Sequence, residues 1–169
     1  QISNNFSYSS PDFISNLGLK SNLNLYLKNT NTIGKNDSTY DSDPQIDGSS
    51  MLVFDNTIPL IKYNDSSLET ITPRISFRVN PGNNMNDQSG TSRNVSLGSV
   101  FELDRLGISE YEAGRSLTLG LGYKFDQLEN FQDDDAKNKF IEFNLATVLR
   151  DQIESEIPST STINRKTSN

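Results

Sequence analysis

The stretch LTLGLGYKF, residues 117–125, decides the fold of this chain. Leu117 and every second residue after it are large and apolar, whereas the residues between them are small, polar or charged. Alternation with a period of two is typical of a β-strand that has one apolar and one polar face. The polar face carries Gly120, Gly122 and Lys124, which cannot form a packed core. The strand therefore belongs either to a soluble sandwich or to a membrane barrel that turns its apolar face to lipid.

The composition excludes membrane-spanning helices but leaves a membrane barrel open. The chain has 169 residues, enough for one domain, of which 33% are hydrophobic, and its mean hydropathy is -0.59. No run approaches the ~18 apolar residues that a transmembrane helix needs. A membrane barrel satisfies the same limits, because only alternate residues of its strands must be apolar.

Charge and residue types exclude several functions. The net charge is -7 and the basic residues are scattered, which argues against nucleic-acid binding. Without Cys or His, the chain has no thiolate or imidazole metal ligand and no nucleophile–base pair built on them. A Ca²⁺ site at residues 133–135 is a weaker interpretation than a solvated acidic turn. We therefore expect no enzymatic activity, no cofactor and no metal.

Six segments alternate in the same way, and their lengths favour membrane strands. Each is about as long as the ~9–11 residues with which a tilted strand crosses a bilayer, whereas soluble strands are nearer ~5–6 residues. Pro73 suits a strand start or a bulge better than a central ladder position. The six segments are residues 2–9, 17–28, 50–61, 71–80, 116–125 and 139–150.

The connections alternate between short turns and long polar loops, as in outer-membrane barrels. The long loops, near 29–49 and 80–115, would face the outside, and the short turn at residues 64–65 would face the periplasm. We expect residues 95–103 to form a short strand or packed loop that folds back on the barrel mouth or into the lumen. The predicted fold is all-β, with antiparallel up-and-down strands of a transmembrane β-barrel. Because six strands cannot close a barrel alone, residues 1–169 should form an open, curved partial barrel.

Several motifs occur in an order that resembles the LPS-assembly protein family (LptD, OstA or Imp). These motifs are TPRISFR at 72–78, FELDRLG at 101–107, EAGRSLTLG at 112–120, LATVLRD at 145–151 and STSTIN at 159–164. The resemblance covers most of residues 52–169. Asp104 stands where the family commonly has Asn, and Glu110 where it commonly has Asp; both departures are conservative.

The resemblance implies an internal fragment of a C-terminal outer-membrane barrel of roughly 26 strands. Such a barrel assembles lipopolysaccharide into the outer leaflet of the outer membrane of Gram-negative bacteria. Its implied partners are lipopolysaccharide, outer-membrane lipids, a plug lipoprotein like LptE and the periplasmic bridge components of the same transport machinery. The chain begins at Gln1 without a signal peptide, and we expect it to be an internal piece of a longer protein.

Two groups of residues are candidate sites. Arg74 and Arg78 share the polar face of one strand and could contact lipopolysaccharide or a plug, because Arg binds phosphate bidentately. The alternative is ordinary lumen charge paired with wall carboxylates such as Glu142.

The second group could fix the long loop, with Arg105 pairing to Glu110 or Glu112. As an exposed pair this contact would contribute only ~0–1 kcal/mol. The alternative is local turn chemistry with surface charges. The members of this network are Asp104, Arg105, Glu110, Glu112 and Gly114.

Two other functions remain open at this point. A passive diffusion porin would share the strand lengths and loop asymmetry but not the ordered motifs. A secreted β-sandwich binding module would bury the apolar face against a second sheet and would stay soluble without detergent.

Overall fold

The computed structural model describes residues 2–34, 42–82, 95–106, 111–127 and 140–151, together with 153, 157, 163, 167 and 168. These residues form nine strands and no helix that is long and apolar enough to cross a membrane. The strands are β1 (Ile2–Ser9), β2 (Phe13–Ile14), β3 (Lys20–Thr32), β4 (Gln45–Thr57), β5 (Leu60–Asn64), β6 (Ser67–Asn80), β7 (Gly114–Gln127), β8 (Phe140–Arg150) and β9 (Thr167–Ser168).

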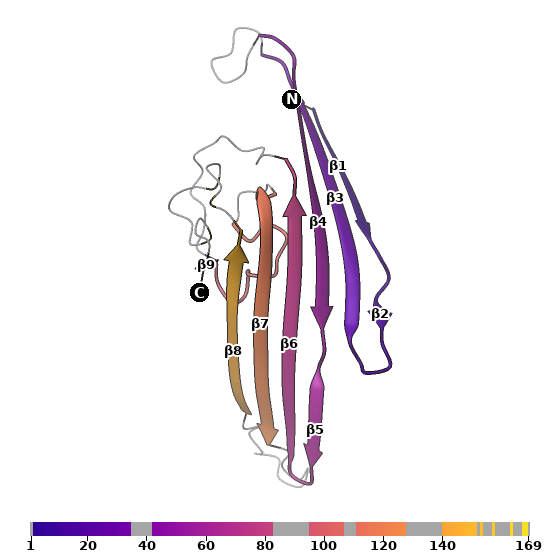
Figure 1. Cartoon of the computed structure of the whole chain (residues 1–169), viewed down its shortest axis with the longest axis vertical. Helices are drawn as coiled ribbons and strands as arrows, with labels where there is room; N and C mark the ends of the chain where they lie inside the picture. Colours follow the sequence, from indigo (N-terminus) through magenta and orange to yellow (C-terminus); the bar gives the residue numbers. More distant parts are fainter. Residues whose placement is uncertain are drawn as a thin grey trace, which may run out of the picture.

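All nine strands belong to one antiparallel sheet (Figure 1). The order is β1-β3-β4-β6-β7-β8-β9, with β2 beside β3 and β5 beside β6. Within the described chain, β1 and β9 lie at opposite ends of this order and do not pair, so the sheet is open. The predicted all-β, antiparallel, open arrangement is confirmed.

The strands that flank the first expected long loop extend further than the alternation predicts. β3 continues to Thr32 and β4 begins at Gln45, so much of the expected loop at 29–49 is a β-ladder. Asn29 and Asn31 stand where apolar side chains would continue the pattern. The backbone still pairs there although the apolar pattern has ended, because backbone hydrogen bonds do not depend on the side chains. Hydrophobic periodicity therefore locates only the apolar part of each strand.

The expected segment at 50–61 is two strands, separated at Ile58 and Pro59. This break explains how Pro73 lies well inside the 14-residue strand β6. The Pro73 carbonyl accepts a hydrogen bond from the Ile58 amide (3.2 Å), so the Pro73 nitrogen points to the same neighbouring strand. Ladder pairing between the strands stops at Thr57 and resumes at Leu60. Proline has no N–H to donate, and Pro73 lies opposite the gap between β4 and β5, where ladder pairing with β6 is interrupted.

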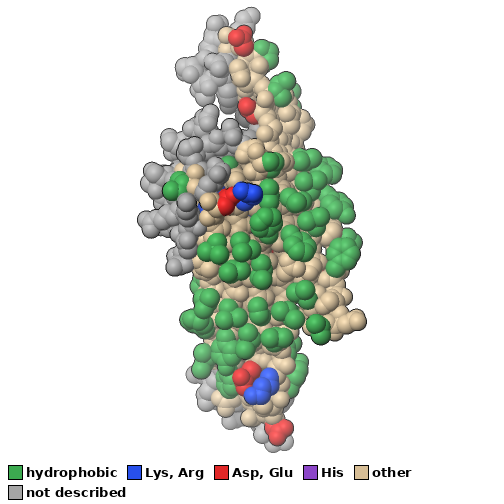
Figure 2. Space-filling model, in the orientation of Figure 1, with side chains coloured by type: hydrophobic (Ala, Val, Ile, Leu, Met, Phe, Trp, Pro, Cys, Tyr) green, Lys and Arg blue, Asp and Glu red, His purple; other side chains and the backbone are tan. Residues whose placement is uncertain are grey.

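The two faces of the sheet differ in composition and in burial, and the apolar face is the exposed one. One row of directly paired residues on the apolar face crosses five strands through Leu23, Phe54, Phe77, Leu117 and Leu149. Phe77 is 43% exposed in this row, and no described element covers it. Figure 2 shows the hydrophobic side chains gathered over the middle of the sheet.

The opposite face of the sheet, here called the polar face, carries the buried residues. Ser76 and Thr118 are fully buried there although both are hydrophilic. They are covered by residues 95–106, here called the inner segment, which forms turns and bends rather than a strand. The expectation of a packed loop is therefore confirmed. A small apolar cluster joins the inner segment to β8 and includes Val100, Leu106, Val148, Ile157 and Ile163.

Candidate functional site

The inner segment is attached to the sheet by a buried ion pair between Arg105 and Glu112. The Arg105 Nε donates to Glu112 Oε2 at 2.6 Å, and Arg105 Nη2 donates to Glu112 Oε1. This two-point contact is the bidentate geometry that guanidinium and carboxylate prefer. Arg105 also donates to Thr118 Oγ1 (2.9 Å) and to Ser116 Oγ (2.8 Å), both on β7. One arginine thus connects the inner segment, the residues that precede β7 and β7 itself.

Arg150 adds β8 to the same cluster. Its Nη1 donates to Glu112 Oε1 at 3.3 Å and its Nη2 to the Ala113 carbonyl at 2.6 Å. Arg105, Glu112, Arg150, Ser116 and Thr118 are all almost completely inaccessible to solvent, and we call them the buried ion cluster.

Sequence reasoning missed Arg150. Its position is set by the register Ser116↔Arg150, and this pairing could not be read from the sequence.

Burial and charge act in opposite directions on Glu112. Burial raises the pKa of its carboxyl group, because the charged form loses its hydration. The positive charges of Arg105, Arg78 and Arg150, with the hydrogen bond from Arg105, outweigh burial and hold the pKa below its ordinary value. Glu112 is therefore ionised at neutral pH.

The burial of Arg105 corrects one sequence-based expectation. The sequence predicts an exposed pair with Glu112, but Arg105 is only 1% exposed because the inner segment folds onto the sheet. Gly114 begins β7 with a positive φ of 82°, a conformation that side chains rarely adopt. Asp104 is half-buried. Glu110 lies outside the described residues.

The two arginines of β6 have different surroundings. Arg78 is buried beneath the inner segment and donates to the Leu103 carbonyl (3.4 Å). Arg74 is half-buried, and its guanidinium carbon lies 4.1 Å above the centre of the Phe101 ring.

In the alternative interpretation, wall carboxylates such as Glu142 pair with these arginines, but Glu142 accepts a hydrogen bond from Asn144 (2.6 Å). The carboxylate beside Arg74 is Asp55, with Arg74 Nη2 and Asp55 Oδ2 3.7 Å apart.

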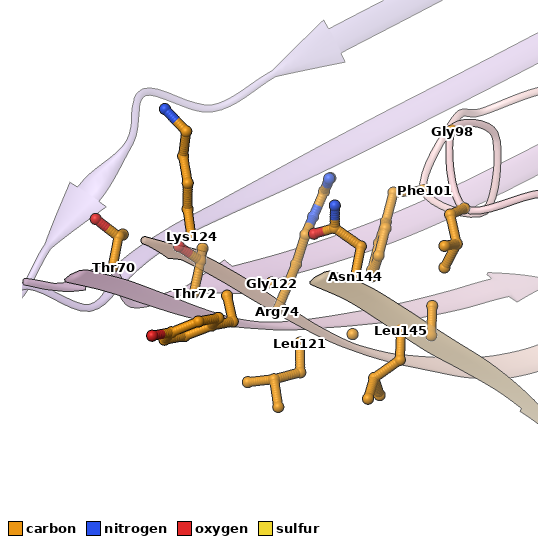
Figure 3. Close-up of a pocket in the computed structure, with 14 residues that line it drawn as sticks. Thr70, Thr72, Arg74, Gly98, Phe101, Leu121, Gly122, Lys124, Asn144 and Leu145 are labelled. Atoms are coloured by element: carbon orange, nitrogen blue, oxygen red, sulfur yellow. The ribbon is translucent and has the colours of Figure 1, made fainter. Parts of the chain in front are cut away.

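Two hollows lie below the inner segment and share Thr72 and Arg74. The first, of about 410 Å³, is lined by Phe101 of the inner segment and by residues of β6, β7 and β8. The second, of about 310 Å³, extends towards β3 and β4 and includes Asp55. In Figure 3, Arg74, Lys124 and Asn144 point to the side of the sheet where Phe101 lies, and Leu121 and Leu145 point to the opposite side.

Gly120 makes room for the inner segment. A Cβ atom at this position would lie 2.7 Å from the Phe101 ring, closer than real Cβ atoms approach other atoms. The absence of a side chain therefore lets Phe101 rest on the backbone of β7. This gives the alternation of small residues in LTLGLGYKF a structural role.

No family model, curated protein or solved structure matches this chain. Within the described residues there is no group of three or more acidic side chains that could hold a metal ion. The acidic run at 133–135, considered above for Ca²⁺, lies outside the described residues.

Proposed function

We propose that this chain is part of the wall of an outer-membrane β-barrel that assembles lipopolysaccharide into the outer leaflet. The localisation rests first on the exposed apolar face of the sheet. Hydrophobic side chains exposed over five adjacent strands form a far larger patch than soluble monomers tolerate. In a membrane barrel, lipid covers such an apolar face while the polar face on the other side lines water, which supports the proposed localisation.

The height of the apolar face supports the same localisation. On its outer side, Arg115 pairs with Asp151 near one end, and Glu69 pairs with Lys62 near the other. Val79 pairs with Arg115 and Glu69 with Phe125 in the β6–β7 ladder, so these rims are ten residues apart. At ~3.3 Å per residue and a tilt of ~40°, ten residues span ~25 Å, the height of the apolar band of a membrane barrel.

The buried ion cluster is the observation that supports lipopolysaccharide assembly over other barrel functions. The motifs that resemble the LPS-assembly family lie far apart in the sequence but come together here. Arg78 belongs to the first of these motifs, Arg105 to the second, Glu112 to the third and Arg150 to the fourth. All four side chains are buried against one another or beneath the same segment. A set of motifs that builds one structural unit is a stronger basis for the proposal than any motif alone.

On this proposal the polar face lines the barrel lumen and the inner segment lies within it. The proposed partners are lipopolysaccharide, the surrounding lipids, a plug lipoprotein like LptE and the periplasmic bridge of the transport machinery. A passive diffusion porin is the alternative, since its wall would also expose an apolar face to lipid.

Depletion of the intact protein in its Gram-negative host tests the proposal. Newly made lipopolysaccharide should fail to reach the cell surface, and sensitivity to large hydrophobic antibiotics should rise. Slower uptake of small hydrophilic solutes with normal surface lipopolysaccharide would instead identify a porin. If the purified intact protein stays monodisperse without detergent, the membrane localisation itself is wrong.

A further inference from the structure

The inner segment keeps its shape through hydrogen bonds within itself. The Val100 amide donates to the Ser96 carbonyl (2.8 Å), and the Glu102 amide donates to the Ser99 carbonyl (2.9 Å). The hydroxyl groups of Ser96 and Ser99 are also hydrogen-bonded to each other (3.2 Å). None of these bonds involves the sheet, so separation of the segment from the wall would not break them.

Little apolar surface holds the inner segment against the wall. Val100 and Leu106 are its only buried hydrophobic residues, whereas Leu97 is 54% exposed. The wall beneath the segment is hydrophilic and includes Ser76 and Thr118. Because hydrophobic stabilisation scales with the apolar area removed from water, it opposes the separation of these surfaces less than it opposes the opening of an apolar core.

Arg78 carries a buried charge that the contact with the inner segment compensates poorly. It is 1% exposed, but it donates only one long hydrogen bond within the described chain, to a main-chain carbonyl of the segment at 3.4 Å. Its Nε atom is buried without a described partner. Two carboxylates attract its charge and two arginines repel it, namely Glu112, Asp55, Arg105 and Arg74.

Ser76 adds a second unsatisfied group on the same face of β6. Its hydroxyl oxygen is buried and has no hydrogen-bond partner among the described residues. A buried polar group without a partner is unfavourable, and a charged group more so. Both Ser76 and Arg78 regain water when the segment leaves the wall, so both favour separation. The Arg105–Glu112 pair opposes it, because separation breaks its contacts with β7.

We propose that the inner segment is a gate of the barrel lumen that opens as a unit, held closed by the Arg105–Glu112 pair and opposed by Arg78 and Ser76. The open arrangement gives a large solute room along β6, β7 and β8 that the closed arrangement denies it. The inference deepens the proposed function and rests on it, since only a closed barrel makes the polar face the wall of a lumen.

Thiol accessibility in the purified intact protein, in an uncharged maltoside detergent, tests the gate. Val100→Cys, in a version of the protein free of other cysteines, places a thiol that is protected while the segment is closed. Leu97→Cys is the exposed reference on the same segment. A small water-soluble methanethiosulfonate is the probe, and mass spectrometry follows the reaction.

We expect the thiol at position 100 to react more slowly than the thiol at position 97, but to completion. Its rate should depend little on low concentrations of urea, because a local opening exposes much less surface than global unfolding does.

Substitutions in the Val100→Cys background test the balance of contacts. Arg105→Met should speed the reaction at least about tenfold, because it leaves a buried carboxylate without its main partner. Arg78→Met should slow the reaction about tenfold, because methionine occupies the space without burying a charge. Ser76→Ala should slow it about fivefold. Arg115→Met removes a charge from the opposite face and should leave the rate unchanged. Rates at position 97 in each background correct for changes in thiol reactivity.

The gate is overturned if the thiol at position 100 reacts only at urea concentrations that unfold the whole protein, because the segment is then a fixed part of the wall. Equal rates at positions 97 and 100 would show that the segment is not closed in the first place. A reaction that Arg78→Met leaves unchanged or makes faster would remove Arg78 from the balance. All these rates are measured without lipopolysaccharide, so failure of the gate is distinct from failure of the proposed function.

Discussion

Removal of Arg105 should destabilise the protein far more than removal of a surface arginine. The side chain makes two hydrogen bonds to Glu112, each between charged groups. Bonds of this kind contribute about 1.5–3 kcal/mol each, which gives about 3–6 kcal/mol for the pair. Breaking a buried ion pair by removing one partner costs about 3–5 kcal/mol, since the remaining charge stays buried. We therefore expect Arg105→Met to lower the free energy of unfolding by about 3–5 kcal/mol.

Denaturant unfolding of the intact protein in lipid vesicles measures this change through its midpoint, provided that the slope is unchanged. Arg115→Met is the control, because its partner Asp151 is partly exposed and the loss should be ~0–1 kcal/mol. The double variant Arg105→Met with Glu112→Gln should cost less than the sum of the two single losses, because Arg105 and Glu112 contact each other directly. A loss below ~1 kcal/mol for Arg105→Met, or additive losses in the double variant, would refute the buried ion pair as the attachment of the inner segment.

Three further predictions follow from the faces, the charge state and the topology of the sheet. Leu145→Arg should destabilise the barrel by about 2–4 kcal/mol because it forces a charge into lipid. Asn144→Arg, one residue away on the polar face, should cost much less. Equal unfolding midpoints of the two variants would refute the assignment of faces. The pKa of Glu112 is lower in the folded state than in the unfolded state. The ionised carboxyl group therefore stabilises the fold above the unfolded-state pKa of ~4.3, and this stabilisation is lost as the pH falls through the folded-state pKa. The difference in unfolding free energy between wild type and Glu112→Gln should therefore be constant near pH 7 and shrink below about pH 4, and a difference that grows on acidification would contradict the sign. Single cysteines at Asp43 and Asp65, introduced into a version of the intact protein free of other cysteines, should label on intact cells with a membrane-impermeant maleimide at Asp43 only; labelling at Asp65 alone would invert the topology.

The sequence by itself determined the strands and their faces. Alternation in LTLGLGYKF and in five other segments is a local property, and each of these segments overlaps a strand of the sheet. The same parity assigns Phe77 to the apolar face and Arg78 to the polar face, as observed. Strand ends were less predictable, because the β3–β4 ladder continues where all side chains except Ile46 are polar or absent.

Tertiary structure alone decided which polar residues are buried. Parity assigns Ser76 and Thr118 to a hydrophilic face, where water would be expected, yet both are fully buried beneath the inner segment. The same segment makes the Arg105–Glu112 pair a buried ion pair and joins Arg150 to it through the register of β7 and β8. Register and the path of a long connection depend on contacts between residues far apart in the chain. Periodicity reports only which side of its own strand a residue occupies, and so it cannot show what lies against that side.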